Sequence, residues 1–117
     1  MRARSVAAAA IVAALSACSS ASSHVGTSPG PGGANQVVIS NYKFHPPTLT
    51  VPIGTTVTWV NHDMARHTIT RQTVGSERFD SGLLGNQEAF SHTFRTAGSY
   101  GYLCVPHAGM QGMIVVQ

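Results

Sequence analysis

The most constraining feature of this sequence is a series of short runs in which apolar and polar residues alternate, separated by Gly and Pro. The run Thr55–Val60 shows the pattern best, because Val57 and Trp59 fall on one face and Thr56 and Thr58 on the other. A period of two is that of a β-strand, and no stretch keeps the period of a helix over a convincing length. Seven or eight such runs predict an all-β fold, an antiparallel Greek-key β-sandwich.

The runs lie between residues 36 and 117, which leaves room for one small domain and not for two. The expected strands are Val37–Ile39, Thr48–Val51, Thr55–Val60, Arg66–Thr70, Ala89–Arg95, Tyr100–Cys104 and Met113–Val116. A domain of this size has a marginal core when it lacks a disulfide, so a bound metal would help to stabilise it.

The first residues have the features of an export signal. Two arginines in the first four positions precede an apolar run, Val6–Leu15, that is too short to span a bilayer permanently. The run ends in Leu15-Ser16-Ala17-Cys18, which resembles the bacterial lipobox, in which the Cys is lipidated and the chain is cut just before it. We expect residues 1–17 to be a signal peptide and Cys18 to be the lipidation site; an ordinary secretory signal with an incidental Cys is the alternative.

Residues 18–35 are rich in Ser, Gly, Pro and Ala and show no apolar period, which is typical of a flexible tether. The expected organisation is therefore a signal peptide, a tether and a folded domain at 36–117. Such a protein would be exported and held by its lipid at the outer, extracytoplasmic face of the cell membrane, in the periplasm or cell envelope.

The charge distribution argues against nucleic-acid binding, and the cysteine content favours a metal site. Without Arg2 and Arg4, five basic residues stand against four acidic ones and are spread singly, so no basic stripe exists to bind nucleic acid. Of the two cysteines, lipidation of Cys18 would leave Cys104 as a free thiol in an oxidising compartment. A metal is the most direct reason for such a thiol.

The segment Cys104–Met110 carries the residues with the most specific chemistry. Cys104, His107 and Met110 supply a thiolate, an imidazole and a thioether three residues apart, on a loop between two expected strands. His67 begins an earlier strand, whose edge a sandwich can bring beside this loop. Two His and one Cys with a weak axial Met form the ligand set of a blue copper site, whereas zinc more often takes a fourth strong ligand and iron–sulfur clusters four Cys.

The sequence resembles the cupredoxin family, and within it the plastocyanin and amicyanin group, over roughly Val37–Val116. The resemblance rests on Tyr42-Lys-Phe44, Leu49-Thr-Val-Pro52, Gly54–Asn61, His67-Thr68, Gly98–Cys104 and His107–Gly112. It implies a type 1 site for one copper ion, with ligands His67, Cys104, His107 and Met110. It also implies a single-electron carrier cycling between Cu(II) and Cu(I), whose redox partner proteins dock on an apolar patch around His107. We also expect the protein to be a monomer.

Two residues beside His67 depart from the family pattern. Many relatives have Pro where this chain has Arg66, which would place a cation near the copper. Many also have Asn where this chain has Thr68, whose hydroxyl could still tie the ligand loops together. Pro106 has no N–H and cannot donate a hydrogen bond to the Cys104 thiolate.

Several alternatives accompany these assignments. The chain has no Ser-His-Asp set, no His-Glu-X-X-His motif and no second copper site, so we expect no enzyme. A module that buffers or delivers copper in the envelope is the alternative to the electron carrier. Met113 competes with Met110 as axial ligand but follows the pattern of a strand. His92 fits a structural histidine on an apolar face, and Tyr100 fits the corner tyrosine of a Greek key.

Overall fold

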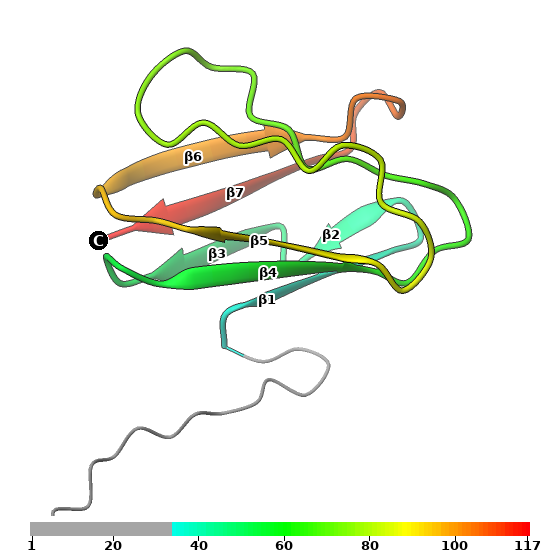
Figure 1. Cartoon of the computed structure of the whole chain (residues 1–117), viewed down its shortest axis with the longest axis horizontal. Coiled ribbons are helices and arrows are strands. Elements are labelled where there is room, and N and C mark those ends of the chain that lie inside the picture. The colour runs from blue at the N-terminus through cyan, green and yellow to red at the C-terminus, as the bar shows by residue number, and fades with distance from the viewer. Residues whose placement is uncertain (1–33) are drawn as a thin grey trace, which may run out of the picture.

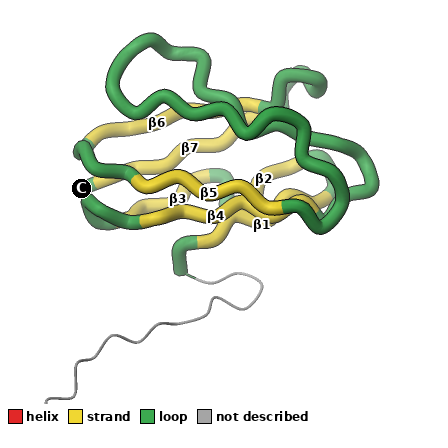
Figure 2. Tube along the Cα trace, in the orientation of Figure 1, coloured by secondary structure: helices red, strands yellow, loops and turns green. Residues whose placement is uncertain are grey.

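The computed structural model describes residues 34–117, so the expected signal peptide, Cys18 and most of the tether lie outside the described residues. This part of the chain consists of strands and loops, with no helix long and apolar enough to cross a membrane (Figures 1 and 2). The strands are β1 (Gln36–Ser40), β2 (Lys43–His45), β3 (Thr48–Val51), β4 (Thr56–Asn61), β5 (Ala89–Thr93), β6 (Gly98–Leu103) and β7 (Gln111–Val116).

Two sheets form the sandwich that the sequence predicts (Figure 1). One sheet has the strand order β2-β1-β4-β5 and the other has the order β3-β7-β6. The pairing is mixed and not wholly antiparallel as expected, because β1 runs parallel to β4 and β3 runs parallel to β7. In both pairs the chain passes through other strands between the two partners, so no tight turn forces them to run in opposite directions.

The alternation in the sequence places the apolar side chains between the sheets. In β4, Val57 and Trp59 are fully buried and Thr56 is exposed. The Trp59 ring packs against four other aromatic rings at centroid distances of 5.5 to 6.4 Å, namely those of Phe79, Phe90, Phe94 and Tyr102. The same alternation continues along β6 and carries Cys104 into the interior directly after the strand.

The expected strand at Arg66–Thr70 does not form. His67 pairs singly with Leu84, and Thr70 pairs singly with Asp80 and Leu103, within a long connection from residue 62 to residue 88. Three consecutive residues of the run, 67 to 69, are buried, which breaks the in-and-out alternation of a strand with one exposed face.

Glu77 fastens this connection to the end of β5. Its carboxylate accepts hydrogen bonds from the backbone N–H of Arg95 (2.6 Å) and of Thr96 (3.0 Å) and from His92 Nε2 (2.9 Å). Burial acts to raise the pKa of Glu77, but these hydrogen bonds outweigh it and hold the pKa below its usual value. His92 is thus the hydrogen-bonded structural histidine that the sequence predicts.

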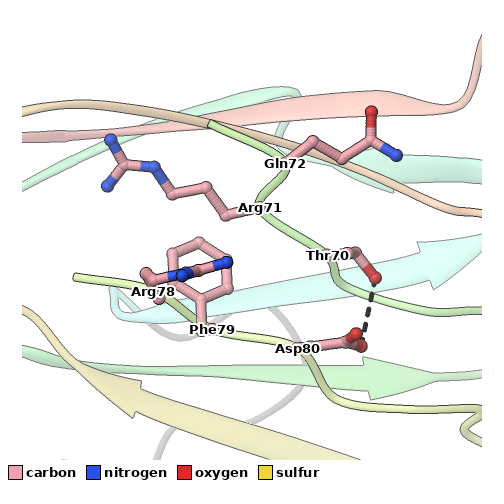
Figure 3. A pocket seen from close by; sticks show the side chains of 6 residues that line it. All are labelled: Thr70, Arg71, Gln72, Arg78, Phe79 and Asp80. Atoms are coloured by element: carbon pink, nitrogen blue, oxygen red, sulfur yellow. Dashed lines mark hydrogen bonds between the residues drawn. The ribbon is translucent and has the colours of Figure 1, made fainter. Parts of the chain in front are cut away.

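The same end of the sandwich holds Tyr100, whose hydroxyl donates to the carbonyl of Thr96 at 2.6 Å, as a corner tyrosine does. The Arg71 guanidinium lies 4.4 Å from the Tyr100 ring centroid. Arg71 also lines an open pocket of ≈ 630 Å³, in which the Thr70 hydroxyl donates a hydrogen bond to the Asp80 carboxylate (Figure 3). Its lining contains none of the four expected ligands; it consists of Thr70, Arg71, Gln72, Arg78, Phe79 and Asp80.

Three connections meet at the opposite end of the sandwich, on the right in Figure 1. They are the β1–β2 turn, the start of the connection after β4 and the β6–β7 loop. All the expected ligands lie on the second and third of these connections.

Candidate metal centre

The β6–β7 loop is closed by two backbone hydrogen bonds. The N–H of Cys104 donates to the carbonyl of Met110 at 3.0 Å, and the N–H of Met110 donates to the carbonyl of His107 at 3.3 Å. Gly109 adopts a φ of 82°, a left-handed conformation that suits glycine. The loop therefore folds back on itself and brings the three expected ligands of this segment to one end of β6.

Three donor atoms converge beside this loop. His107 Nδ1 lies 3.2 Å from Cys104 Sγ, and His67 Nδ1 lies 3.7 Å from the same sulfur and 3.1 Å from His107 Nδ1. Nitrogen and thiolate ligands bind a first-row ion such as zinc at about 2.0–2.3 Å, so two donors of one ion lie within about 4.6 Å of each other. All three separations meet this limit, and the structure brings together the His67, Cys104 and His107 predicted from the sequence.

Burial differs among the four expected ligands. His67 and Cys104 are buried, and His107 is partly exposed at the surface. Met110 is also buried, and its backbone bonds directly to Cys104 and His107. Met113 lies in β7, with 38% of its surface exposed and its N–H bonded to Pro47. The geometry therefore favours Met110 over Met113 as a fourth ligand.

Asp63 fixes the orientation of the His67 ring. Its Oδ2 atom accepts a hydrogen bond from His67 Nε2 at 2.9 Å, so Nε2 carries the proton and Nδ1 presents its lone pair to the other donors. The carboxylate also accepts hydrogen bonds from the backbone N–H of Asn41 (2.8 Å) and of Tyr42 (2.9 Å). Burial acts to raise the pKa of Asp63, but the hydrogen bonds outweigh it and lower the pKa.

Asn61 shapes the chain between β4 and His67. Its side chain is fully buried, and its Nδ2 donates to the carbonyls of Ala65 (2.9 Å) and Leu84 (3.0 Å). Its Oδ1 accepts a hydrogen bond from the N–H of Asp63 at 2.9 Å. This last bond is an Asx-type turn, which places Asp63 where it can reach His67.

Thr68 joins the two connections that carry the donors. Its N–H donates to Cys104 Sγ at 3.4 Å, and its hydroxyl accepts a hydrogen bond from the N–H of Val105 at 2.9 Å. The tie between ligand loops expected from this hydroxyl is therefore present. The N–H of Thr68 gives the thiolate a donor that Pro106 cannot provide.

The sequence did not predict the roles of Asn61 and Asp63, nor the hydrogen bond from Tyr42 to Asp63. The spacing Asn61-X-Asp63 is compatible with an Asx turn, and Asp63 stands four residues before His67, but neither feature reveals a contact with the metal centre. His45 and His62 match no ligand position of the family pattern, and both are exposed and outside the donor cluster.

A β-sandwich with one buried thiol and two imidazoles at one end defines a mononuclear metal-binding domain with soft ligands. Residues 33–117 match the family model described as copper binding proteins, plastocyanin/azurin family. The chain belongs to this family, and its cofactor is copper.

Individual relatives agree with this assignment. The amicyanin of Paracoccus denitrificans is 36% identical over 87 residues, which cover 73% of this chain and 66% of the amicyanin. The plastocyanin of Scenedesmus fuscus is 40% identical over 89 residues, covering 63% of this chain and 86% of the plastocyanin. A solved structure of the Cu(I) form of an amicyanin mutant is 37% identical with a TM-score of 0.66, covering 73% of this chain and 83% of that one.

Proposed function

We propose that the protein is a type 1 blue copper protein that carries single electrons, with His67, Cys104, His107 and Met110 as the ligands of one copper ion. The convergence of Cys104 Sγ and the two imidazole Nδ1 atoms, all within 3.7 Å of one another, carries this proposal. Bound copper supplies a one-electron Cu(II)/Cu(I) couple, and thiolate and imidazole ligands together suit both oxidation states.

The surrounding residues hold the donors in one arrangement. Asp63 fixes the ring of His67, and Thr68 bonds to the thiolate and to the backbone beside it. Donors held in this way need not rearrange when an electron arrives or leaves, which is the requirement on a carrier. The site also lacks an acid–base pair with free access to a substrate, so we propose no enzymatic reaction.

Partners would reach the centre through His107. This residue is partly exposed, and the neighbouring Val105 has 58% of its surface exposed, next to Pro106 and Ala108. An uncharged apolar patch of this kind suits brief contact with a redox partner protein, because weak redox complexes bury less than about 1,200 Å². We propose that the protein acts as a monomer and docks its partners here.

An absorption spectrum of the purified domain after addition of Cu(II) tests the proposal. A Cu(II)–thiolate bond gives an intense visible charge-transfer band, so we expect a blue protein and expect Cys104→Ser to lose the band. The matched control is His62→Ala, which removes an exposed histidine outside the donor cluster and should leave the band intact. A colourless Cu(II) complex of the unaltered domain would overturn the proposal.

The second candidate function is a module that buffers or delivers copper. Release of the ion would require the donors to separate, whereas His67 and Cys104 are buried and joined by hydrogen bonds to both connections. This closure favours the carrier. Rapid transfer of Cu(I) to an acceptor protein, together with slow electron self-exchange, would favour delivery instead.

We also propose that the protein is exported and lipid-anchored at the extracytoplasmic face of the membrane. The support is the sequence of residues 1–35, with a signal peptide to residue 17, a lipidated Cys18 and a tether before the domain at 36–117. Mass spectrometry should find acyl groups on an N-terminal Cys18, and Cys18→Ser should give uncut or soluble protein. An unmodified N-terminus at another residue would contradict the anchor.

A further inference from the structure

The turn between β1 and β2 has an unexpected residue at its second position. Asn41 and Tyr42 are its two central residues, with φ of 51° and 58°, and Ser40 pairs with Lys43 across it. Two consecutive positive φ values are those of a type I′ hairpin turn, for which Asn-Gly is the favoured pair. A side chain with a Cβ is strained at the second position, and such strain persists where the surrounding structure requires it, often at functional sites.

The Tyr42 ring contacts both imidazoles of the metal centre. It lies perpendicular to the ring of His107, with centroids 4.9 Å apart, and perpendicular to the ring of His67, with centroids 5.2 Å apart. The two imidazoles themselves lie 4.8 Å apart. Tyr42 is 53% exposed, so burial in the hydrophobic core does not explain why a large residue stands in this turn.

Asp63 connects the turn rigidly to the same site. Its carboxylate accepts the backbone N–H groups of both turn residues, Asn41 and Tyr42, and its Oδ2 atom is shared between Tyr42 and His67. The position of the Tyr42 backbone relative to His67 is therefore fixed by one side chain. The ring can then restrain His107, which lies on a short loop and is partly exposed.

We infer that Tyr42 is a positioning residue for the copper centre, whose ring holds the imidazoles of His67 and His107 in their binding geometry before copper arrives. Edge-to-face contacts favour the perpendicular arrangement seen here, and donors that are already ordered lose less conformational freedom when they bind an ion. The inference rests on the proposed ligand set. It explains why the chain keeps a strained tyrosine where glycine would be relaxed.

Two variants separate this role from a structural one. Tyr42→Gly creates the favoured Asn-Gly turn and removes only a half-exposed ring, so the melting midpoint of the copper-free domain should change little. Its copper affinity should fall roughly tenfold, which equals about 1.4 kcal/mol. Tyr42→Phe keeps the ring and loses only the hydroxyl, and it should match the parent in both measurements.

NMR of the copper-free domain supplies a readout that does not depend on the metal. In the parent and in Tyr42→Phe, the aromatic ring should show contacts to both imidazoles and the His107 ring should be ordered; in Tyr42→Gly the His107 ring should become mobile. An equally ordered His107 ring and unchanged affinity in Tyr42→Gly would overturn the inference. So would a Tyr42→Phe variant that behaves like Tyr42→Gly, or a large loss of stability with unchanged affinity. A parent that binds Cu(II) without a blue band would instead refute the proposed function.

Discussion

Asn61→Ala should destabilise the domain strongly, although Asn61 is not one of the proposed copper ligands. The side chain is completely buried and makes three hydrogen bonds, two to the carbonyls of Ala65 and Leu84 and one from the N–H of Asp63. Alanine makes none of them. A hydrogen bond contributes about 1 kcal/mol net, and a buried polar group left without a partner costs about 1–3 kcal/mol.

Three lost hydrogen bonds correspond to a decrease of about 3 kcal/mol in the free energy of unfolding. For a domain of this size, each kcal/mol lowers the melting midpoint by about 4–8 °C, so we expect a decrease of roughly 12–24 °C. Asn61→Asp has the same shape but cannot donate to two carbonyls, and it places a carboxylate against them. We expect its loss of stability to be at least as large.

Urea unfolding of the copper-free domain measures these effects. Asn86→Ala is the matched control, because Asn86 is exposed and its side chain also donates to two carbonyls, those of His62 (3.3 Å) and Asp63 (3.0 Å). Its loss should stay below about 1 kcal/mol, since water can replace exposed partners. An Asn61→Ala variant no less stable than Asn86→Ala would refute the assignment of Asn61 as the buried organiser of this segment.

Three further predictions concern other parts of the domain. Gly112→Ala should cost about 1–3 kcal/mol of stability by overpacking, because a Cβ there would overlap the hydroxyl of the buried Tyr102, its partner across β6 and β7; urea unfolding checks this. The folded-state pKa of Glu77 is lowered, so its stabilising contribution is present above the unfolded-state pKa and is lost as pH falls through the folded-state pKa. Glu77→Gln should therefore lower stability at neutral pH and flatten the acid side of the stability curve, measured by urea unfolding between pH 7 and pH 3. Met110→Leu should shift the reduction potential in voltammetry while the blue colour persists, whereas Met113→Leu should leave the potential unchanged.

The sequence predicts the fold best for strands that have one buried face and one exposed face. Val57 and Trp59 predict the buried face of β4 correctly, because a strand between core and solvent must alternate. The direction of pairing was not predictable in this way. Alternation determines which face of a strand is buried and carries no information about its neighbour, so the parallel pairs β1–β4 and β3–β7 were missed.

The residues of the metal centre also differ in how far the sequence predicts them. The side-chain chemistry and close spacing of Cys104, His107 and Met110 are visible along the chain, whereas His67 is singled out mainly by the family resemblance. The structure brings His67, Cys104 and His107 together, and Met110 stays a predicted ligand. Asp63 and Tyr42 act through contacts between segments that the fold brings together, the turn after β1 and the connection after β4. A carboxylate or a tyrosine in a surface loop has no sequence pattern that distinguishes such a role from simple exposure.

The directions of β1 and β7 determine where the domain can be attached to other objects. β1 begins at Gln36, opposite Thr58 in the middle of β4, and runs toward the Asn41–Tyr42 turn, whereas β7 runs from the metal loop back to the C-terminus at the far end of the sandwich (Figure 1). The five residues of β1 alone span about 17 Å at about 3.3 Å per residue. A fusion partner or an electrode joined to the C-terminus therefore leaves the end of the sandwich that carries His107 free to meet a partner.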